Sequence, residues 1–227
     1  MINNKENILV IAPHCDDEVL GCGGTINFYS EKGNEVYVLF ITNANLGDKK
    51  KYSTKFLKKI RSEAIRSNSY LGVKKTFFLD FPVNNLNTIN LTTLIDAIQK
   101  IFIKVNPSHI FIPHSNDIHN DHKIVNHCSL VASRPTSNKV NLNIFEYETL
   151  SETEWGEEYK FSPNYYKILR KKDLNNKCNA MKIYKSQIKK APHPRSLKAI
   201  QSLAVLRGSN ISNNFAEAFI LKRYISK

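Results

Sequence analysis

Two short clusters of histidine and acidic residues carry most of the chemistry that this sequence offers. The first is Pro13-His14-Cys15-Asp16-Asp17-Glu18, and the second runs from His114 through Asp117 and His119 to Asp121-His122. Imidazole nitrogens and carboxylate oxygens are zinc ligands, and a catalytic zinc site usually takes three protein ligands and leaves a position for water. Two histidines and one carboxylate satisfy that count. The pattern therefore predicts a catalytic metal site built from both clusters.

Each cluster directly follows an apolar run that reads as a buried strand. The runs are Ile8-Leu9-Val10-Ile11-Ala12 and Ile110-Phe111-Ile112-Pro113, and we expect helices over 19–32 and 121–132 after the clusters. In a parallel α/β sheet the carboxyl ends of the strands open on one edge, where ligands bind. The two clusters are therefore expected to meet at that edge.

Spacing within each cluster assigns different roles to its side chains. His14 and Asp17 are three residues apart, as are His119 and His122, and residues three apart share a face in a helical turn. Asp16 is displaced from that face, which favours a base between two ligands. The alternative is that Asp16 or Asp17 caps the following helix, a role that does not exclude metal binding.

The residues around both clusters extend the pattern. Its most specific parts are His14-Cys15-Asp16-Asp17-Glu18 with Gly21-Cys22-Gly23-Gly24-Thr25-Ile26, and Asp117-Ile118-His119-Asn120-Asp121-His122. This pattern resembles the signature of the PIG-L/LmbE-like family of zinc-dependent N-deacetylases. Less specific similarity at Arg61-Ser62-Glu63-Ala64 and Tyr184-Lys185-Ser186-Gln187 spreads the resemblance over most of the chain. It implies a hydrolase that removes the acetyl group from an N-acetylated amino sugar.

The resemblance also implies a role for individual residues. The positions that match the family's zinc ligands are His14, Asp17 and His122. Asp16 matches the general base, which would take a proton from the attacking water and hand it to the departing amine. A protonated His119 would stabilise the negative oxygen of the tetrahedral intermediate, and Asp121 would hold His119 in its charged form. Arg61 matches a substrate-binding arginine, although an exposed helix arginine is an equal alternative.

Two loops depart from the family pattern. Thr42-Asn43-Ala44-Asn45 stands where many members carry Thr-Asp-Gly-Glu, and Pro82-Val83-Asn84 replaces Pro-Asp-Gly. The catalytic set is intact, whereas the residues that select the substrate differ. The acetylated sugar and its nucleotide-, lipid- or thiol-linked carrier therefore stay open, and iron(II), cobalt or manganese would also accept these ligands.

The whole chain, 1–227, is expected to form a single α/β domain with a Rossmann-like, mostly parallel sheet and helices on both faces. The strand-like runs are 8–12, 36–42, 76–79, 109–113 and 142–147. Further helices are expected over 179–190 and 197–208, and the part after Trp155 looks less regular. The glycines after the first strand resemble a dinucleotide fingerprint, but the preceding acids would repel a phosphate there. Close packing of a helix is the alternative.

Composition narrows the classes of partner. The formal net charge of +13 and lysine runs such as 49–51 attract anions, which favours an anionic sugar conjugate over nucleic acid, because no nucleic-acid motif is present. Four cysteines without a CxxC pair, a polar N-terminus and no membrane-length apolar run predict a cytoplasmic protein. Association into a homo-oligomer is left open. The competing function is a non-catalytic module that binds a metal and an anion.

Overall fold

The computed structural model describes residues 5–47, 52–135, 142–156 and 160–226. Its strands are β1 (Asn7–Ala12), β2 (Glu35–Asn43), β3 (Lys75–Pro82), β4 (His109–Pro113), β5 (Asn143–Tyr147), β6 (Tyr165–Ile168) and β7 (Ala216–Arg223). Its helices are α1 (Asp17–Glu31), α2 (Ala44–Gly47), α3 (Thr54–Tyr70), α4 (Leu91–Val105), α5 (Asn120–Ala132), α6 (Lys171–Ile183) and α7 (Leu197–Ser209). Two short 3-10 helices are η1 (Leu86–Thr88) and η2 (Thr153–Trp155).

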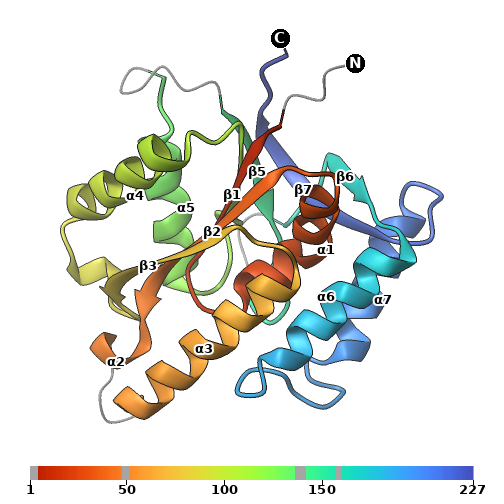
Figure 1. The fold of residues 1–227 in the computed structure, drawn as a ribbon, viewed down its shortest axis with the longest axis horizontal. Helices are drawn as coiled ribbons and strands as arrows, with labels where there is room; N and C mark the ends of the chain where they lie inside the picture. The colour runs from red at the N-terminus through yellow and green to blue at the C-terminus, as the bar shows by residue number, and fades with distance from the viewer. Residues whose placement is uncertain (1–4, 48–51, 136–141, 157–159, 227) are drawn as a thin grey trace.

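The seven strands within the described ranges form one sheet in the order β3-β2-β1-β4-β5-β7-β6 (Figure 1). Strands β1 to β5 pair in parallel, whereas β7 runs antiparallel to both β5 and β6. The expected α/β fold with a mostly parallel sheet is confirmed.

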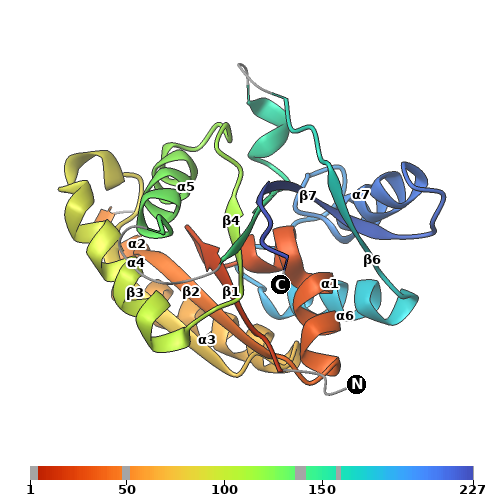
Figure 2. The ribbon, with the colours of Figure 1, turned by 90° about the horizontal axis from the view of Figure 1, so that it is seen from above.

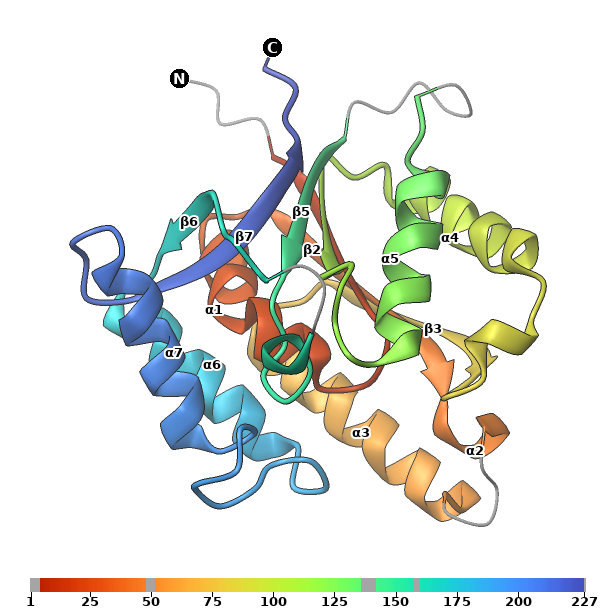
Figure 3. The same ribbon diagram turned by 180° about the vertical axis from the view of Figure 1, so that it is seen from behind.

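Both faces of the sheet are buried, which explains why β1 reads as a continuous apolar run. Ile8 and Val10 pack into a core with α1, α3, α6 and α7, whereas Leu9 and Ile11 pack into a second core with α4 and α5. Figures 2 and 3 show the two helix layers on opposite sides of the sheet. The central strand is thus held by apolar contacts on both sides.

The register of the central strands places the two chemical clusters side by side. Strand β1 lies between β2 and β4, with Leu9 opposite Ile110 in the parallel pair with β4. Both strands therefore end at the same edge. Helix α1 follows β1 after a tight turn and begins at Asp17, two residues before its expected start. Asp17 accordingly sits in the first helical turn.

The glycine cluster in α1 allows close packing of the helix. A Cβ at Gly21 would lie 2.3 Å from Cδ2 of Tyr147, and a Cβ at Gly24 would lie 2.5 Å from Cδ1 of Leu169. Tyr147 in turn donates a hydrogen bond from its hydroxyl to the Ile11 carbonyl, at 2.9 Å. These contacts explain the glycines by packing against the sheet rather than by a bound phosphate.

The C-terminal part is more regular than the sequence predicted. The residues after Trp155 contribute β6, α6, α7 and β7. The expected helix over 197–208 is confirmed by α7, but the one over 179–190 is wrong, because α6 begins at Lys171 and ends at Ile183. Asp173 accepts a hydrogen bond from the Arg170 N–H and fixes the start. Tyr184 then turns inward to donate to Glu18, which ends the helix.

Other expectations concern cysteines, membrane crossing and lysines. All four cysteines are free and buried, and burial raises the pKa of Cys15 well above its usual value. In the part of the chain that the structure describes, none of the helices has the length and apolar character needed to cross a membrane. The lysine run 49–51 lies outside the described residues.

A buried ion pair joins the C-terminal elements to α1. Lys177 Nζ lies 2.6 Å from Glu217 Oε1, and the two side chains are only 5% and 4% exposed. Glu217 also accepts hydrogen bonds from the main-chain N–H groups of Gly24 and Thr25, at 2.9 and 2.7 Å. Lys177 also donates to the Leu20 carbonyl at 2.8 Å. The pair therefore fixes α1 against α6 and β7.

Lys177→Met is expected to destabilise the protein by about 3–5 kcal/mol, because it leaves the Glu217 charge buried without its partner. The measurement is the free energy of unfolding from urea denaturation. Lys171→Met is the matched control, since Lys171 is exposed at the start of the same helix. An unfolding free energy for Lys177→Met equal to that of the control would contradict the role given to the pair.

Candidate metal centre and active-site pocket

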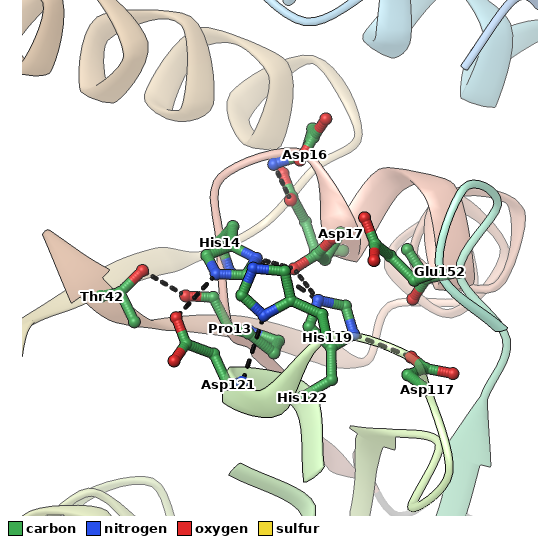
Figure 4. Close-up of polar contacts among 12 residues, drawn as sticks. Pro13, His14, Asp16, Asp17, Thr42, Asp117, His119, Asp121, His122 and Glu152 are labelled. Carbon is green, nitrogen blue, oxygen red and sulfur yellow. Dashed lines mark hydrogen bonds and ion pairs between the residues drawn. The ribbon is translucent and has the colours of Figure 1, made fainter. Parts of the chain in front are cut away.

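The two predicted clusters meet at the carboxyl edge of the sheet. His14, Asp16 and Asp17 occupy the turn between β1 and the start of α1, and His119 and His122 lie at the start of α5 after β4. Figure 4 shows the side chains of His14, Asp17, His119 and His122 converging from the two elements, with Asp16 in the adjoining turn. The structure thus brings the expected ligand and base positions together in one site.

Three ligand atoms are equally spaced at the centre of the site. His14 Nδ1 lies 3.3 Å from Asp17 Oδ2, His122 Nε2 lies 3.2 Å from the same oxygen, and the two nitrogens are 3.3 Å apart. Ligands about 2.0–2.1 Å from a tetrahedral metal are separated by about 3.3 Å. The donor types and their spacing therefore fit three corners of a tetrahedral metal site.

A carboxylate lies behind each histidine of this triad. Asp121 Oδ2 is 3.1 Å from His14 Nε2, and Asp117 Oδ2 is 2.8 Å from His122 Nδ1. Metal-binding histidines commonly donate their second ring N–H to such a carboxylate, which fixes the tautomer and orients the ring. Thr153 donates to the other Asp117 oxygen at 2.6 Å. The arrangement therefore orients both imidazoles toward the proposed metal position.

The role predicted for Asp121 needs correction. Asp121 Oδ2 lies 3.1 Å from His14 Nε2 and accepts a hydrogen bond from the Asn84 N–H at 2.7 Å. The carboxylate does not contact the His119 ring through a hydrogen bond in the described residues. The contact to His119 comes from the main chain, because the Asp121 N–H donates to His119 Nδ1 at 3.1 Å. The reason is that His119 is the N-cap residue of α5. Asp121 therefore orients His14, a predicted metal ligand.

The protonation expected for His119 changes as well. Its Nδ1 accepts a hydrogen bond and so carries no proton while that bond is made. Burial, together with the neighbouring His14 and His122, lowers the pKa of His119 to about 4. The hydrogen bond to Nδ1 and the lowered pKa both favour a neutral His119 imidazole with its proton on Nε2. It can donate one hydrogen bond into the site without being charged.

Asp16 is held apart from the triad by an unusual backbone. Its φ of 115° lies in the left-handed region, which strains a residue other than glycine and is typical of functional sites. Although Asp16 is the N-cap residue of α1, its side chain makes no capping hydrogen bond. Its N–H donates to Glu18 Oε2 at 3.0 Å. The capping alternative thus does not account for the Asp16 carboxylate.

The electrostatic environment of Asp16 suits a general base. Burial and the negative charge of Asp17 raise the pKa of Asp16 to about 7, and the cation of Arg195 opposes that rise. A base works best when its pKa is near the working pH. Arg195 Nη1 lies 3.4 Å from Asp16 Oδ2, so the carboxylate also has a fixed neighbour.

The pKa values of the predicted metal ligands His14 and Asp17 shift in opposite directions. Burial alone would lower the pKa of His14, but its hydrogen bonds to Asp121 and Asp17 raise the value to about 9. Burial would likewise raise the pKa of Asp17, yet the nearby His122 and His14 hold it below its usual range. Because a metal binds neutral imidazole, loading this site would release protons from the histidines.

A pocket of about 900 Å³, including the solvent at its mouth, opens beside these residues. Its inner end is lined by His14, Asp16 and His119, together with Glu152. Its outer wall is formed at the start of α3, and the lining residues there are Tyr52, Phe56, Leu57, Ile60 and Arg61. The pocket therefore has a polar, potentially metal-binding floor and a partly aromatic wall with a basic residue.

Arg61 and Arg195 both line this pocket. The Arg61 guanidinium pairs with Asp80 and lies 4.7 Å from the centre of the Phe78 ring. Arg61 therefore lines the pocket with a fixed orientation, and its contact with substrate stays a prediction. Arg195 donates to Gln187 at 3.1 Å, and its buried Nε has no hydrogen-bond partner among the described residues.

Sequence reasoning gave no role to three residues of the site, namely Asp117, Glu152 and Arg195. Asp117 could have been found, since it lies five residues before His122 in the same motif. Glu152 and Arg195 lie in separate loops that only the fold brings to the pocket. His114, which begins the second cluster, pairs with the buried Glu146 at 3.0 Å.

Comparison with known proteins identifies the family of this chain. The family model described as PIG-L, GlcNAc-PI de-N-acetylase, matches residues 9–133. The uncharacterized deacetylase YaiS of Escherichia coli is 28% identical over 189 residues, which are 81% of this chain and 93% of YaiS.

Two solved structures share the fold. The N,N'-diacetylchitobiose deacetylase of Pyrococcus horikoshii superposes with a TM-score of 0.75 at 22% identity, over 95% of this chain and 83% of its own. The 4-carboxy-2-hydroxymuconate hydratase GalB of Pseudomonas putida gives 0.77 at 16% identity, over 98% of each chain. The fold alone therefore does not fix the reaction. The family match, which spans more than half of the chain and contains both clusters, shows that this chain belongs to the PIG-L family of de-N-acetylases.

Proposed function

We propose that this chain is a zinc-dependent hydrolase that removes the acetyl group from an N-acetylated amino sugar or its conjugate, giving a free amine and acetate. The observation that carries the proposal is the triad of His14, Asp17 and His122, whose ligand atoms lie 3.2–3.3 Å apart, with the Asp16 carboxylate in the adjoining turn. Three ligands leave one tetrahedral position open, which is typical of a catalytic rather than a structural zinc.

Each residue of the site would have a separate role in amide hydrolysis. Zinc, when bound, would lower the pKa of a water molecule and polarise the amide carbonyl. Asp16 would accept the proton of the attacking water and deliver it to the departing nitrogen. The neutral His119 would donate its Nε2 proton in a hydrogen bond to the oxyanion. Asp117 and Asp121 would keep the two ligand imidazoles in place.

The family and the positive charge of the chain support a substrate class. The family model is named for an N-acetylglucosaminyl substrate, which supports an acetylated amino sugar. The net charge of +13 and the two arginines that line the pocket favour a conjugate with an anionic group. That group would lie at the outer wall, because the carboxylates around the triad repel anions.

A non-catalytic metal- and anion-binding module is the competing function. It has no use for the Asp16 carboxylate, which is buried at an energetic cost beside the ligands. A structural zinc would also be expected to have four protein ligands. The Asp16 carboxylate, which is not one of the predicted metal ligands, therefore favours a catalytic function.

Metal-stripped protein supplied with zinc is expected to release acetate from one class of N-acetyl sugar, because both water activation and carbonyl polarisation depend on the metal. The panel consists of free, nucleotide-linked, lipid-linked and thiol-linked sugars, and acetate is quantified with and without zinc. Stoichiometric zinc binding with no acetate from any substrate would favour the binding module.

Asp16→Asn is expected to keep bound zinc and to lower kcat by about two to four orders of magnitude, because the amide cannot accept the proton. Zinc content by atomic absorption and turnover are measured on the same sample. Asp17→Ala serves as the comparison, since it removes a ligand and should lose the metal as well. Full activity of Asp16→Asn would show that another group is the base.

Asp117→Asn is expected to weaken zinc affinity about 10- to 100-fold, because His122 loses the charged acceptor that orients it. Competition with a chromogenic chelator at fixed pH measures the affinity. Asp96→Asn is the matched control, since Asp96 is exposed on α4. Equal affinities of the two variants would mean that Asp117 does not support the metal site.

A further inference from the structure

One carboxylate in the pocket has no role in the mechanism above. Glu152 lines the pocket next to the ligands, and Figure 4 shows its carboxylate on the Asp17 side of the triad. Among the described residues, none of the basic side chains forms an ion pair with it, and its side-chain hydrogen bond is a long one of 3.4 Å from Ser151 Oγ. Its oxygens therefore retain free acceptor capacity.

Glu152 is not placed as a ligand of the proposed metal. Within the described residues, the groups of ligand atoms within 4.8 Å of one another are His14, Asp17 and His122, and His14, His119 and Asp121. The acids behind the two ligand histidines are Asp121 and Asp117. Glu152 therefore faces the space that a substrate would occupy.

The loop that carries Glu152 is fixed on both sides. The Glu152 carbonyl accepts a hydrogen bond from Ile118 N–H at 3.2 Å, and Thr153 donates to Asp117 at 2.6 Å. Earlier in the loop, Arg207 pairs with Glu148 through two hydrogen bonds of 2.7 and 2.6 Å. Such support is what a binding group needs to hold one orientation.

The backbone also shows that the position of Glu152 is imposed by its surroundings. Ser151, directly before it, has a φ of 81°, a conformation that is uncommon for residues other than glycine and persists where surrounding contacts enforce it. The Ser151 N–H donates to Glu154 Oε1 at 2.7 Å, which holds the turn. The chain thus maintains strain next to a carboxylate that faces the pocket.

A half-buried carboxylate without a cation selects for hydrogen-bond donors and against anions. In an acetamido sugar bound with its amide at the triad, the donor nearest the reacting group is the hydroxyl on the ring carbon next to the acetamido carbon, away from the linkage to the carrier. We propose that Glu152 is a specificity-determining residue that accepts a hydrogen bond from this 3-hydroxyl. The inference rests on the proposed deacetylase function and narrows its substrate class to sugars with that hydroxyl free.

The test is a cycle of enzyme and substrate changes with the zinc-loaded full chain. The substrates are the methyl glycoside of N-acetylglucosamine and its 3-deoxy and 4-deoxy analogues, and kcat/KM for acetate release is measured with each. The variant is Glu152→Ala. Asp96→Ala is the control, because it removes an exposed acid on α4 that neither lines the pocket nor supports the Glu152 loop.

For the wild type, removal of the 3-hydroxyl is expected to lower kcat/KM about 10- to 100-fold, the contribution of a hydrogen bond to a charged group. Glu152→Ala should show a similar loss on the complete sugar and little further loss on the 3-deoxy sugar. Asp96→Ala should keep the wild-type preference for the 3-hydroxyl. Zinc content of each variant confirms that the metal site is intact.

Additive effects of Glu152→Ala and the 3-deoxy change would overturn the inference, as would coupling to the 4-hydroxyl instead. A fall in kcat to the level of Asp16→Asn on all three sugars would identify Glu152 as part of the proton-transfer machinery and would equally contradict it. If the wild type releases no acetate from any sugar, the result contradicts the proposed deacetylase function, and with it the role of Glu152 that depends on that function.

Discussion

The Asp17 carboxylate is the contact on which the site depends, because its Oδ2 lies 3.2–3.3 Å from ring nitrogens of both His14 and His122. Those histidines come from segments more than one hundred residues apart in the sequence. They meet because β1 and β4 are parallel neighbours that end at one edge of the sheet. The buried apolar faces of the sheet therefore set the geometry of the metal site.

Several contacts remote from the metal maintain this arrangement. Glu18 accepts hydrogen bonds from the Asp16 N–H at 3.0 Å and from the Tyr184 hydroxyl at 2.5 Å, which ties the strained turn to the end of α6. The Lys177 and Glu217 pair holds the middle of α1. Buried acids and a left-handed aspartate are unfavourable in isolation. The C-terminal elements thus stabilise a site to which they contribute no metal ligand.

The site and the central sheet were predictable from sequence for a physical reason. Strands such as β4 are short apolar runs buried on both faces, and the polar clusters follow directly at their ends. The roles of Asp121 and His119 were not predictable, because they depend on which nitrogen of which ring each hydrogen bond reaches. The His119 ring caps α5 and accepts the Asp121 N–H, a detail of one helix turn that residue spacing does not encode.

The parts that sequence reasoning missed depend on contacts between distant segments. Helix α6 starts at a cap formed by Arg170 and Asp173 and ends where Tyr184 turns toward Glu18. Glu152 and Arg195 reach the pocket from loops whose own sequences carry no motif. Local patterns therefore located the cluster of His14, Asp17 and His122, whereas the other residues that line the pocket required the three-dimensional structure.

The central claim is that His14, Asp17 and His122 hold one zinc ion beside Asp16. The most direct test is a crystal structure of the zinc-loaded protein with anomalous diffraction at the zinc edge. We expect a single strong peak about 2.0–2.2 Å from His14 Nδ1, Asp17 Oδ2 and His122 Nε2, with Asp16 unbound. A peak at another set of side chains, or Asp16 as a fourth ligand, would contradict it.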